Sequence, residues 1–255
     1  MNRKQRIVLL AAFAAVGAGA AVGIVAALPE GECAMPSPTA GTTLVAADDF
    51  EQTGGAEGAG RPEWHELRSD PGVSLKREGG VLSVGGTVTR FVREPDGLRT
   101  GHLGLTDFDV RVRVKLVEST GTGAKEAFIE ARSKVGARFR VYMSPKSDLG
   151  GDEDAEGEKG NGHFAADRGD SGSSTPSDTE RTAGYTDLDV NRHIMRLTYE
   201  AASGRARAYV DARLIKEYTL KMSRPAFTIG IESPDEGSSF RAAFDDFELH
   251  GRKGE

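Results

Sequence analysis

The chain has 255 residues, of which 33 are lysine or arginine and 39 are aspartate or glutamate. Its net charge of −6 argues against a nucleic-acid-binding protein, which normally presents a basic face. The single cysteine excludes an internal disulfide framework and a cysteine-rich zinc site, and the five scattered histidines do not favour a histidine metal site.

The amino terminus carries three basic residues and then Ile7–Leu28, a run of 22 uncharged residues. As a helix this run would be about 33 Å long, enough to cross a hydrocarbon core of roughly 30 Å. Because the basic residues come first, the positive-inside bias predicts a cytoplasmic amino terminus and an exported remainder. Two interpretations stay open. Residues 1–28 form an uncleaved signal anchor, which the length favours, or a signal peptide cleaved after residues 25–27.

Residues 29–43 are rich in Pro, Gly, Ser, Thr and Ala and are expected to form a linker. From Leu44 onward, short alternating runs are separated by Gly, Asp and Pro, as is typical of strands and turns. In the clearest run, Phe108–Val117, apolar and charged residues alternate, which predicts a long strand with one buried and one solvated face. Further strands are predicted at residues 44–50, 81–84, 88–92, 127–132, 137–143, 194–199, 206–210, 214–220, 227–232 and 240–249.

Residues 147–184 break this alternation. Between Asp148 and Glu180 there are ten acidic and two basic residues, a net charge of −8, which leaves +2 for the remainder of the chain. A segment so rich in Gly, Asp, Glu and Ser cannot offset the entropy of ordering it by burying apolar surface. We therefore expect an exposed, disordered acidic insertion between two strands.

Residues 190–199 are similar to an N-x-hydrophobic-R-hydrophobic strand, residues 204–214 to an R-x-x-x-Y-V-(N/D)-G-x-L hairpin, and residues 227–231 to a G-hydrophobic-G-hydrophobic strand. With residues 48–50 and 244–250, which are similar to the first and last strands of such domains, these segments resemble the concanavalin A-like superfamily, in its laminin G-like and 3-keto-disaccharide hydrolase-type branch. Ala212 stands where the hairpin usually has glycine. In the last strand Phe244 and Phe247 are core candidates, and the two aspartates between them mark a break in alternation.

The resemblance covers residues 44–250 and implies a fold rather than a function. The expected fold is all-β, a two-sheet antiparallel jelly-roll sandwich preceded by one N-terminal hydrophobic helix, with adjacent terminal strands and a concave face for ligands. Glucanases of this superfamily carry two catalytic carboxylates in a pattern like E-x-D-x-E on one strand. Here Glu126 and Glu130 are separated by the apolar Phe128, and Asp246 and Glu248 have no third carboxylate beside them. We therefore expect a protein that is not an enzyme.

Calcium is the one cofactor that the sequence leaves open. Residues 152–157 begin like an EF-hand loop, but Lys159 and His163 stand where such a loop needs a buried apolar residue and a bidentate glutamate. A solvated acidic loop is the better interpretation. A calcium site of the superfamily type, using Asp187 or Asp189, is the remaining alternative.

Candidate binding residues are aromatic and basic. They are Trp64, His65, Arg138, Arg140 and Tyr142. The alternative for the aromatic residues is packing in the core or across strands. For the arginines it is a solvated sheet face, which Arg111, Arg113, Arg205 and Arg207 would share.

The leading hypothesis is an exported, membrane-tethered β-sandwich module that binds a glycan or a cell-surface protein. Residues 7–28 would be the membrane contact, with the C-terminal domain outside the cytoplasm, or the protein would be secreted or periplasmic if that segment is cleaved. Two alternatives are a glycoside hydrolase-like enzyme of the same superfamily and a purely structural envelope protein.

Overall fold

The computed structural model describes residues 35–51, 60–90, 94–121, 125–145, 162–169, 192–233 and 236–254. The predicted helix over residues 7–28 lies outside these ranges. No helix within the described ranges has the length and apolar character that a membrane span requires.

The regular secondary structure of the described residues consists of strands, without helices. In chain order they are β1 (Thr43–Asp48), β2 (Trp64–Leu67), β3 (Val73–Glu78), β4 (Val81–Thr87), β5 (Asp96–Thr100), β6 (Leu105–Thr120), β7 (Glu126–Arg132), β8 (Arg138–Pro145), β9 (Gly162–Gly169), β10 (His193–Glu200), β11 (Arg205–Val210), β12 (Arg213–Thr219), β13 (Ala226–Glu232) and β14 (Ser239–Lys253).

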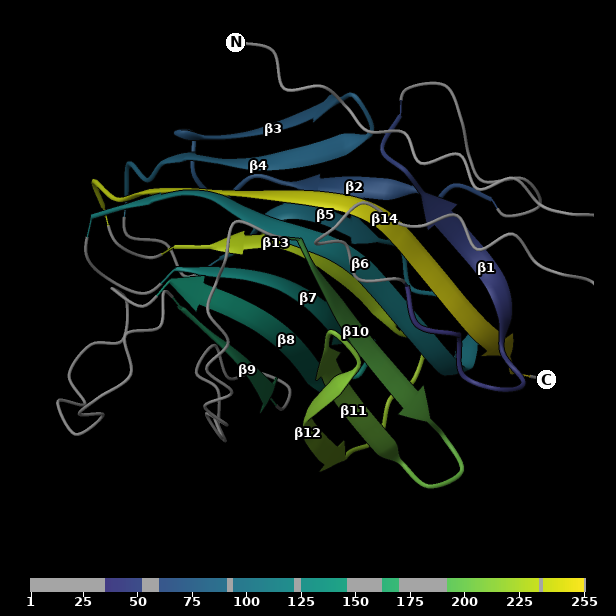
Figure 1. Ribbon diagram of the computed structural model, residues 1–255. Coiled ribbons are helices and arrows are strands. Elements are labelled where there is room, and N and C mark those ends of the chain that lie inside the picture. The colour runs from purple at the N-terminus through teal and green to yellow at the C-terminus, as the bar shows by residue number, and fades with distance from the viewer. Residues whose placement is uncertain are drawn as a thin grey trace, which may run out of the picture.

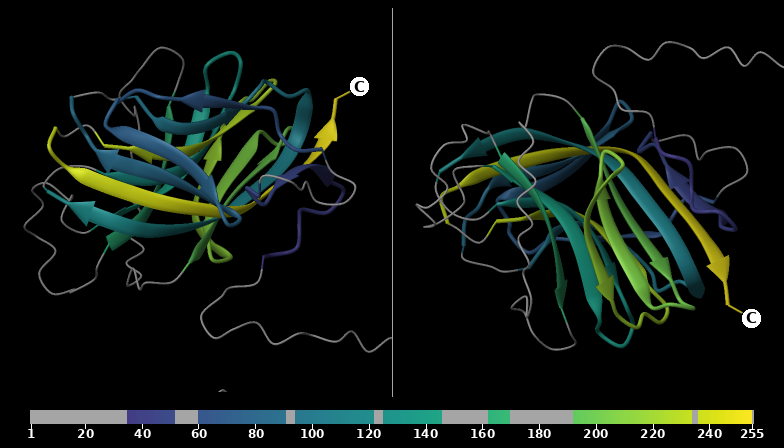
Figure 2. Two further views of the ribbon diagram at one scale, coloured as in Figure 1. Left: turned by 90° about the horizontal axis from the view of Figure 1, so that it is seen from above. Right: turned by 60° about the horizontal axis from the view of Figure 1, so that its bottom comes forward.

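The strands build two antiparallel sheets that pack face to face (Figure 1 and Figure 2). The eight-stranded sheet has the order β12-β11-β10-β6-β14-β4-β3, with β1 also paired to β14. The six-stranded sheet has the order β2-β5-β13-β7-β8-β9. The first and last strands, β1 and β14, are neighbours. The prediction of an all-β, two-sheet antiparallel sandwich is confirmed.

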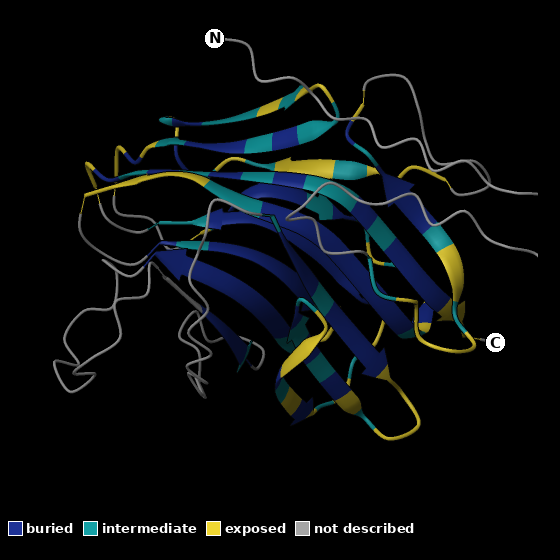
Figure 3. Ribbon diagram, viewed as in Figure 1, coloured by how far each residue is buried: buried dark blue, intermediate teal, exposed yellow. Residues whose placement is uncertain are grey.

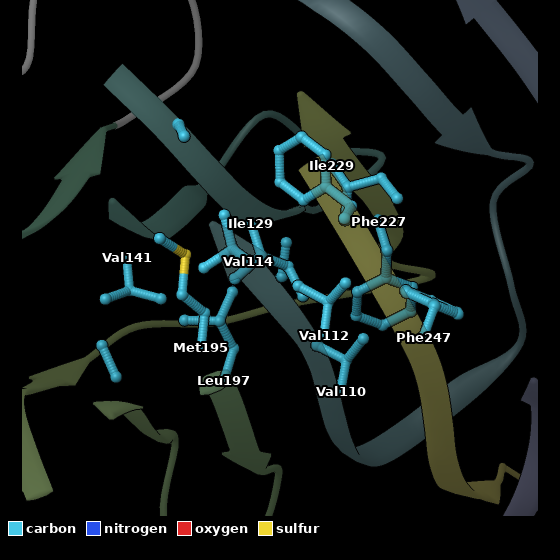
Figure 4. Packing of buried hydrophobic residues seen from close by; sticks show 14 of the residues in the cluster. Val110, Val112, Val114, Ile129, Val141, Met195, Leu197, Phe227, Ile229 and Phe247 are labelled. Atoms are coloured by element: carbon cyan, nitrogen blue, oxygen red, sulfur yellow. The ribbon is translucent and has the colours of Figure 1, made fainter. Parts of the chain in front are cut away.

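The core lies between the sheets and follows from the period-two pattern (Figure 4). Val110, Val112 and Val114 of β6 point toward Ile129 of β7 and Phe227 of β13 on the other sheet. Burying each such side chain contributes about 1.5–3 kcal/mol. This apolar face of the longest strand is therefore what holds the two sheets together.

A bulge in β14 keeps its two phenylalanines on the same side. The pairing with β6 shifts between Asp245 and Glu248, and Asp246 adopts a left-handed backbone with φ of 48°. A bulge adds one residue to the strand. Phe244 and Phe247, three positions apart, are consequently both buried in the core, as the sequence predicted.

The charged face of β6 is not solvated at its centre, so that prediction is wrong (Figure 3). Asp109, Arg111 and Arg113 are all buried. Asp109 binds Arg196 of β10 at 2.6 Å, and other ion pairs join β6 to β14. Part of the expected linker also lies against this face: the backbone nitrogen of Thr39 donates to Asp109 at 2.6 Å.

The expected absence of structure in the acidic insertion is wrong for residues 162–169. They form β9, which pairs with β8 along its whole length. Phe164 and Ala166 enter the core, and Asp167 lies buried on the opposite face. The two alternating apolar residues of this strand are too few to stand out from the acidic segment around them. The rest of residues 147–184 lies outside the described ranges.

Candidate functional site

The face of the six-stranded sheet turned away from the core, here called the outer face, gathers charged side chains. Cross-strand partners lie on the same face of a sheet. The register therefore lines up one row across all six strands. In sheet order this row is His65, Arg99, Thr228, Glu130, Arg140 and Asp167.

Arg140 on β8 is the centre of the first cluster in this row. Its guanidinium forms ion pairs of 2.8 Å each with Glu126 of β7, Asp167 of β9 and Glu232 of β13. Its side chain is only 5% exposed. Burial opposes the charge of Arg140, but the surrounding carboxylates outweigh it and raise its pKa. These contacts tie four strands of the sheet together.

Glu126 in this cluster titrates near neutral pH. Burial raises its pKa to about 7, and repulsion from Glu232 and Asp167 adds to the effect while Arg140 opposes it. Three carboxylates share one guanidinium, so the cluster retains a proton near neutrality. Glu126 and Glu232 are also direct cross-strand partners. The arrangement thus places the carboxyl of Glu126 directly beside a second carboxyl.

A small apolar group occupies the next row of the outer face. Phe128, Tyr142 and Ala165 pack together there, and all three are buried. The Arg140 guanidinium carbon lies 5.4 Å from the ring centroids of both Phe128 and Tyr142, close enough for cation–π attraction. Tyr142 therefore supports Arg140 rather than forming an open aromatic platform.

Around Glu130 of β7 the same face has an excess of positive charge. Glu130 binds Arg132 at 2.8 Å and Arg138 at 3.2 Å, and these arginines and nearby Arg140 outweigh burial and lower its pKa. Arg99 donates to the hydroxyl of Thr228 at 3.0 Å. Burial and the neighbouring Arg132 lower the pKa of Arg99. Three guanidinium groups thus lie near the carboxylate of Glu130, and the carboxylate of Glu94 also attracts Arg99 and Arg132 electrostatically.

This excess charge reaches the surface. His65 is exposed and pairs in register with Arg99, which is half-buried. The Arg132 side chain is 39% exposed. We call His65, Arg99 and Arg132 the basic patch. Guanidinium groups on an accessible sheet face offer several fixed donors to hydroxyl, carboxylate or sulfate oxygens.

The structure brings together three of the five binding candidates that the sequence indicated. Arg138, Arg140 and Tyr142 lie side by side on β8, and His65 lies on the same face at the β2 edge. Trp64 differs, because its ring packs against Phe50 and Phe247 at centroid distances of 6.4 and 5.0 Å.

Trp64 is therefore a structural residue. Its indole nitrogen donates to the buried Asp48 at 2.7 Å. Asp187 and Asp189, the calcium candidates, lie outside the described residues. Within the described ranges, no three or more His, Cys, Asp or Glu side chains are grouped so as to hold a metal ion.

Sequence reasoning missed the partners of these residues. Glu232 on β13 and Asp167 on β9 lie on strands next to β7 and β8, and Arg99 on β5 lies one strand further away, an order that only the fold establishes. On its own strand, Glu126 has only Glu130 as a second carboxylate. The alternation of apolar residues along β13 indicates that Glu232 points away from the core. No sequence signal, however, shows that β13 pairs with β7 so that Glu232 faces Glu126.

Comparison with known proteins shows the fold. No protein-family model and no curated protein matches the chain. A structure reported for endo-acting O-glycanases of the human gut microbiota that initiate mucin breakdown has a TM-score of 0.54 at 10% identity, covering 81% of this chain and 98% of that one. A GlcNAcα1-4Gal-releasing endo-β-galactosidase from Clostridium perfringens has a TM-score of 0.51 at 14% identity, covering 87% of this chain and 66% of that one.

A third similar structure is SCLam, a non-specific endo-β-1,3(4)-glucanase of family GH16. Its TM-score is 0.50 at 15% identity, covering 89% of this chain and 98% of that one. At such identities the likeness shows the fold alone. The chain therefore has the concanavalin A-like jelly-roll fold that its sequence resembles.

Proposed function

We propose that the protein is a glycan-binding module whose ligand surface is the basic patch on the outer face of the six-stranded sheet. The observation that carries the proposal is the cluster of Arg99, Arg132 and Arg138, three guanidinium groups near Glu130 and Glu94, with Arg99 and Arg132 reaching solvent. The similar solved structures are described as enzymes that act on glycans. Their descriptions support a glycan as the ligand class.

Binding of a glycan by the full chain tests this proposal. We would screen a glycan array with the wild type in detergent, with and without calcium, and repeat it with Arg99→Ala/Arg132→Ala. Arg207→Ala is the matched control, because Arg207 is 32% exposed and, like Arg132, pairs with one glutamate. Saturable binding that the double variant loses and the control keeps supports the proposal. A blank array, or loss only in Arg207→Ala, contradicts it.

We also propose that the module is exported and stays tethered through residues 7–28. The support is the sequence of that segment, whose length and flanking basic residues favour an anchor over a signal peptide. Mass spectrometry of the protein from cells should find an amino terminus at Met1 or Asn2. An amino terminus near Leu28 would instead indicate a secreted or periplasmic protein.

A second candidate function is glycoside hydrolysis, which the pairing of Glu126 with Glu232 favours. Side chains directly opposite on antiparallel strands have β-carbons about 4.5–5.5 Å apart, close to the 5–5.5 Å between carboxyls in retaining glycosidases. Glu126, with its pKa raised to about 7 chiefly by burial, suits the acid, and Glu232 suits the nucleophile. Release of reducing ends that Glu232→Gln abolishes would support it. Equal release by wild type and variant would contradict it.

A further inference from the structure

A cleft of about 320 Å³ lies at one edge of the sandwich, where the end of β12 meets the ends of β8 and β9. β12 is the edge strand of the eight-stranded sheet and β9 that of the six-stranded sheet, and the two are in contact. The turn between β7 and β8 closes the cleft from the side, with Val135 exposed at its rim. Its size is at the lower end of the range for small-molecule sites.

The cleft is lined by basic side chains. Arg138, Arg168 and Lys221 line it, and none of its described lining residues carries a carboxylate, the nearest described one being that of Glu130 on Arg138. Lys221 is exposed at the cleft, whereas Arg138 is largely buried, with 12% of its side chain exposed. Cations gathered in a recess with low-dielectric walls attract anions into it.

One donor in the wall of the cleft is left without an acceptor. Arg138 gives one terminal nitrogen to Glu130, but its Nε is buried and has no hydrogen-bond partner among the described residues. Gly169 is the cross-strand partner of Arg138, and a β-carbon there would lie 2.6 Å from this Nε. Because Gly169 has no side chain, the Nε–H of Arg138 is not crowded at this point. A buried donor without a partner is costly, so an acceptor at this point is favoured.

We infer that this cleft binds the acidic group, a carboxylate or a sulfate, of a sugar unit in the glycan proposed above, an inference that rests on the proposed function. Arg138 belongs both to the cleft and to the cluster around Glu130 that holds Arg132 of the basic patch. Arg132 and Arg138 are also cross-strand neighbours. An acidic glycan can thus follow basic side chains from the patch on the sheet face to Lys221 at the edge.

The test compares acidic with neutral glycans by titration calorimetry on the full chain in detergent. The probes are polygalacturonate, chondroitin sulfate, its chemically desulfated form and neutral laminarin. We expect tight binding of polygalacturonate, of chondroitin sulfate or of both, weakened by added salt because the contacts are ionic. Loss of chondroitin binding on desulfation identifies sulfate as the group, and binding of polygalacturonate identifies carboxylate.

Two variants locate the acidic group in the cleft. Lys221→Glu should weaken binding about ten-fold or more, since hydrogen bonds to charged groups are the strong ones. Gly169→Ala, which displaces Arg138, should also weaken it. Lys76→Glu is the matched control: the same charge change at an exposed lysine on β3, the opposite edge of the eight-stranded sheet from β12.

The outcomes separate this inference from the proposed function. If laminarin binds as tightly as the acidic glycans and Lys221→Glu has no effect, the inference that the cleft binds an acidic group is wrong. The proposal of a glycan-binding module would then still stand. Equal weakening by Lys221→Glu and Lys76→Glu would also overturn it, because general charge would then explain the loss. No binding of any glycan would overturn both. Thermal midpoints of the variants equal to that of the wild type show that a loss of binding is not a loss of folding.

Discussion

Replacing Arg140 by methionine would remove the guanidinium that Glu126, Asp167 and Glu232 share. The methionine side chain can retain packing against Phe128 and Tyr142, so the change acts mainly on charge. Each of the three ion pairs is 2.8 Å long. Glu126 and Asp167 lie on β7 and β9, the two neighbours of β8, and Glu232 lies on β13, the strand beyond β7. The three carboxylates would then face one another without a cation between them.

The expected loss follows from the burial of these partners. Removing one member of a buried ion pair typically costs about 3–5 kcal/mol. Asp167 is 1% exposed, but Glu126 and Glu232 are 20% and 21% exposed and regain some hydration. We therefore expect a loss of about 3–4 kcal/mol at pH 7. For a domain of this size that corresponds to a drop in Tm of about 6–16 °C.

Thermal and guanidinium unfolding, followed by circular dichroism at pH 5 and pH 8, would measure the loss. In the variant, protonation of the folded cluster relieves repulsion, so the folded state binds more protons than the unfolded chain and the loss shrinks as the pH falls. Arg207→Met, at an exposed ion pair, should leave Tm nearly unchanged. A loss for Arg140→Met no larger than for Arg207→Met, or one that does not change with pH, would refute this reasoning.

Three further predictions concern single positions. Glu126→Gln should become more stable relative to the wild type as the pH rises from about 4.5 to 8. Burial raises the pKa of Glu126 to about 7 in the folded state, so the wild type loses stability as this group releases its proton, whereas the glutamine variant does not. Denaturant unfolding across this pH range measures the difference. Gly97→Ala should lose about 1–3 kcal/mol in the same assay, since its β-carbon would lie 2.1 Å from a backbone oxygen of β13, whereas Gly101→Ala, with nothing within 4 Å, should not. Trp64→Phe should lose about 1–2 kcal/mol with its hydrogen bond to the buried Asp48, and in the wild type saturating glycan should leave the tryptophan fluorescence unchanged.

Strands with strict alternation could be predicted from the sequence because one side of each is buried in the core. The run Phe108–Val117 lies within β6, and the predicted strands at 194–199 and 227–232 fall within β10 and β13. In each, every second side chain is apolar and enters the core. The alternation of apolar and polar residues was therefore sufficient to predict the all-β fold class.

Other strands gave no such signal. β2 and β5 are four and five residues long, and β5 contains a glycine and two charged residues. The opposite error occurred after β4: the strand predicted at 88–92 is absent over its described residues. There the backbone nitrogens of Thr89 and Arg90 donate to the buried Asp70 rather than to a neighbouring strand.

The candidate site was predictable in its residue types but not in its partners. Alternation places Arg138, Arg140 and Tyr142 on one face of β8. The carboxylates that Arg140 binds come from β7, β9 and β13, and register between strands is set by core packing and turn geometry rather than by local sequence. A carboxyl pair across two strands, such as Glu126 and Glu232, is therefore invisible to a search along one strand.

The error about solvated faces has a general physical cause. Alternating charged residues show that a strand has two different faces, but not that the charged one meets water. Arg111 of β6 is buried because Glu248, its direct partner on β14, neutralises it at hydrogen-bond distance, and Arg140 is buried among carboxylates of three strands. Burial of a charge requires an opposite charge on a neighbouring strand. Both sheets meet that requirement at these arginines, but the exposed cross-strand pair of Arg207 and Glu217 shows that opposite charges on paired strands do not by themselves indicate a covered face.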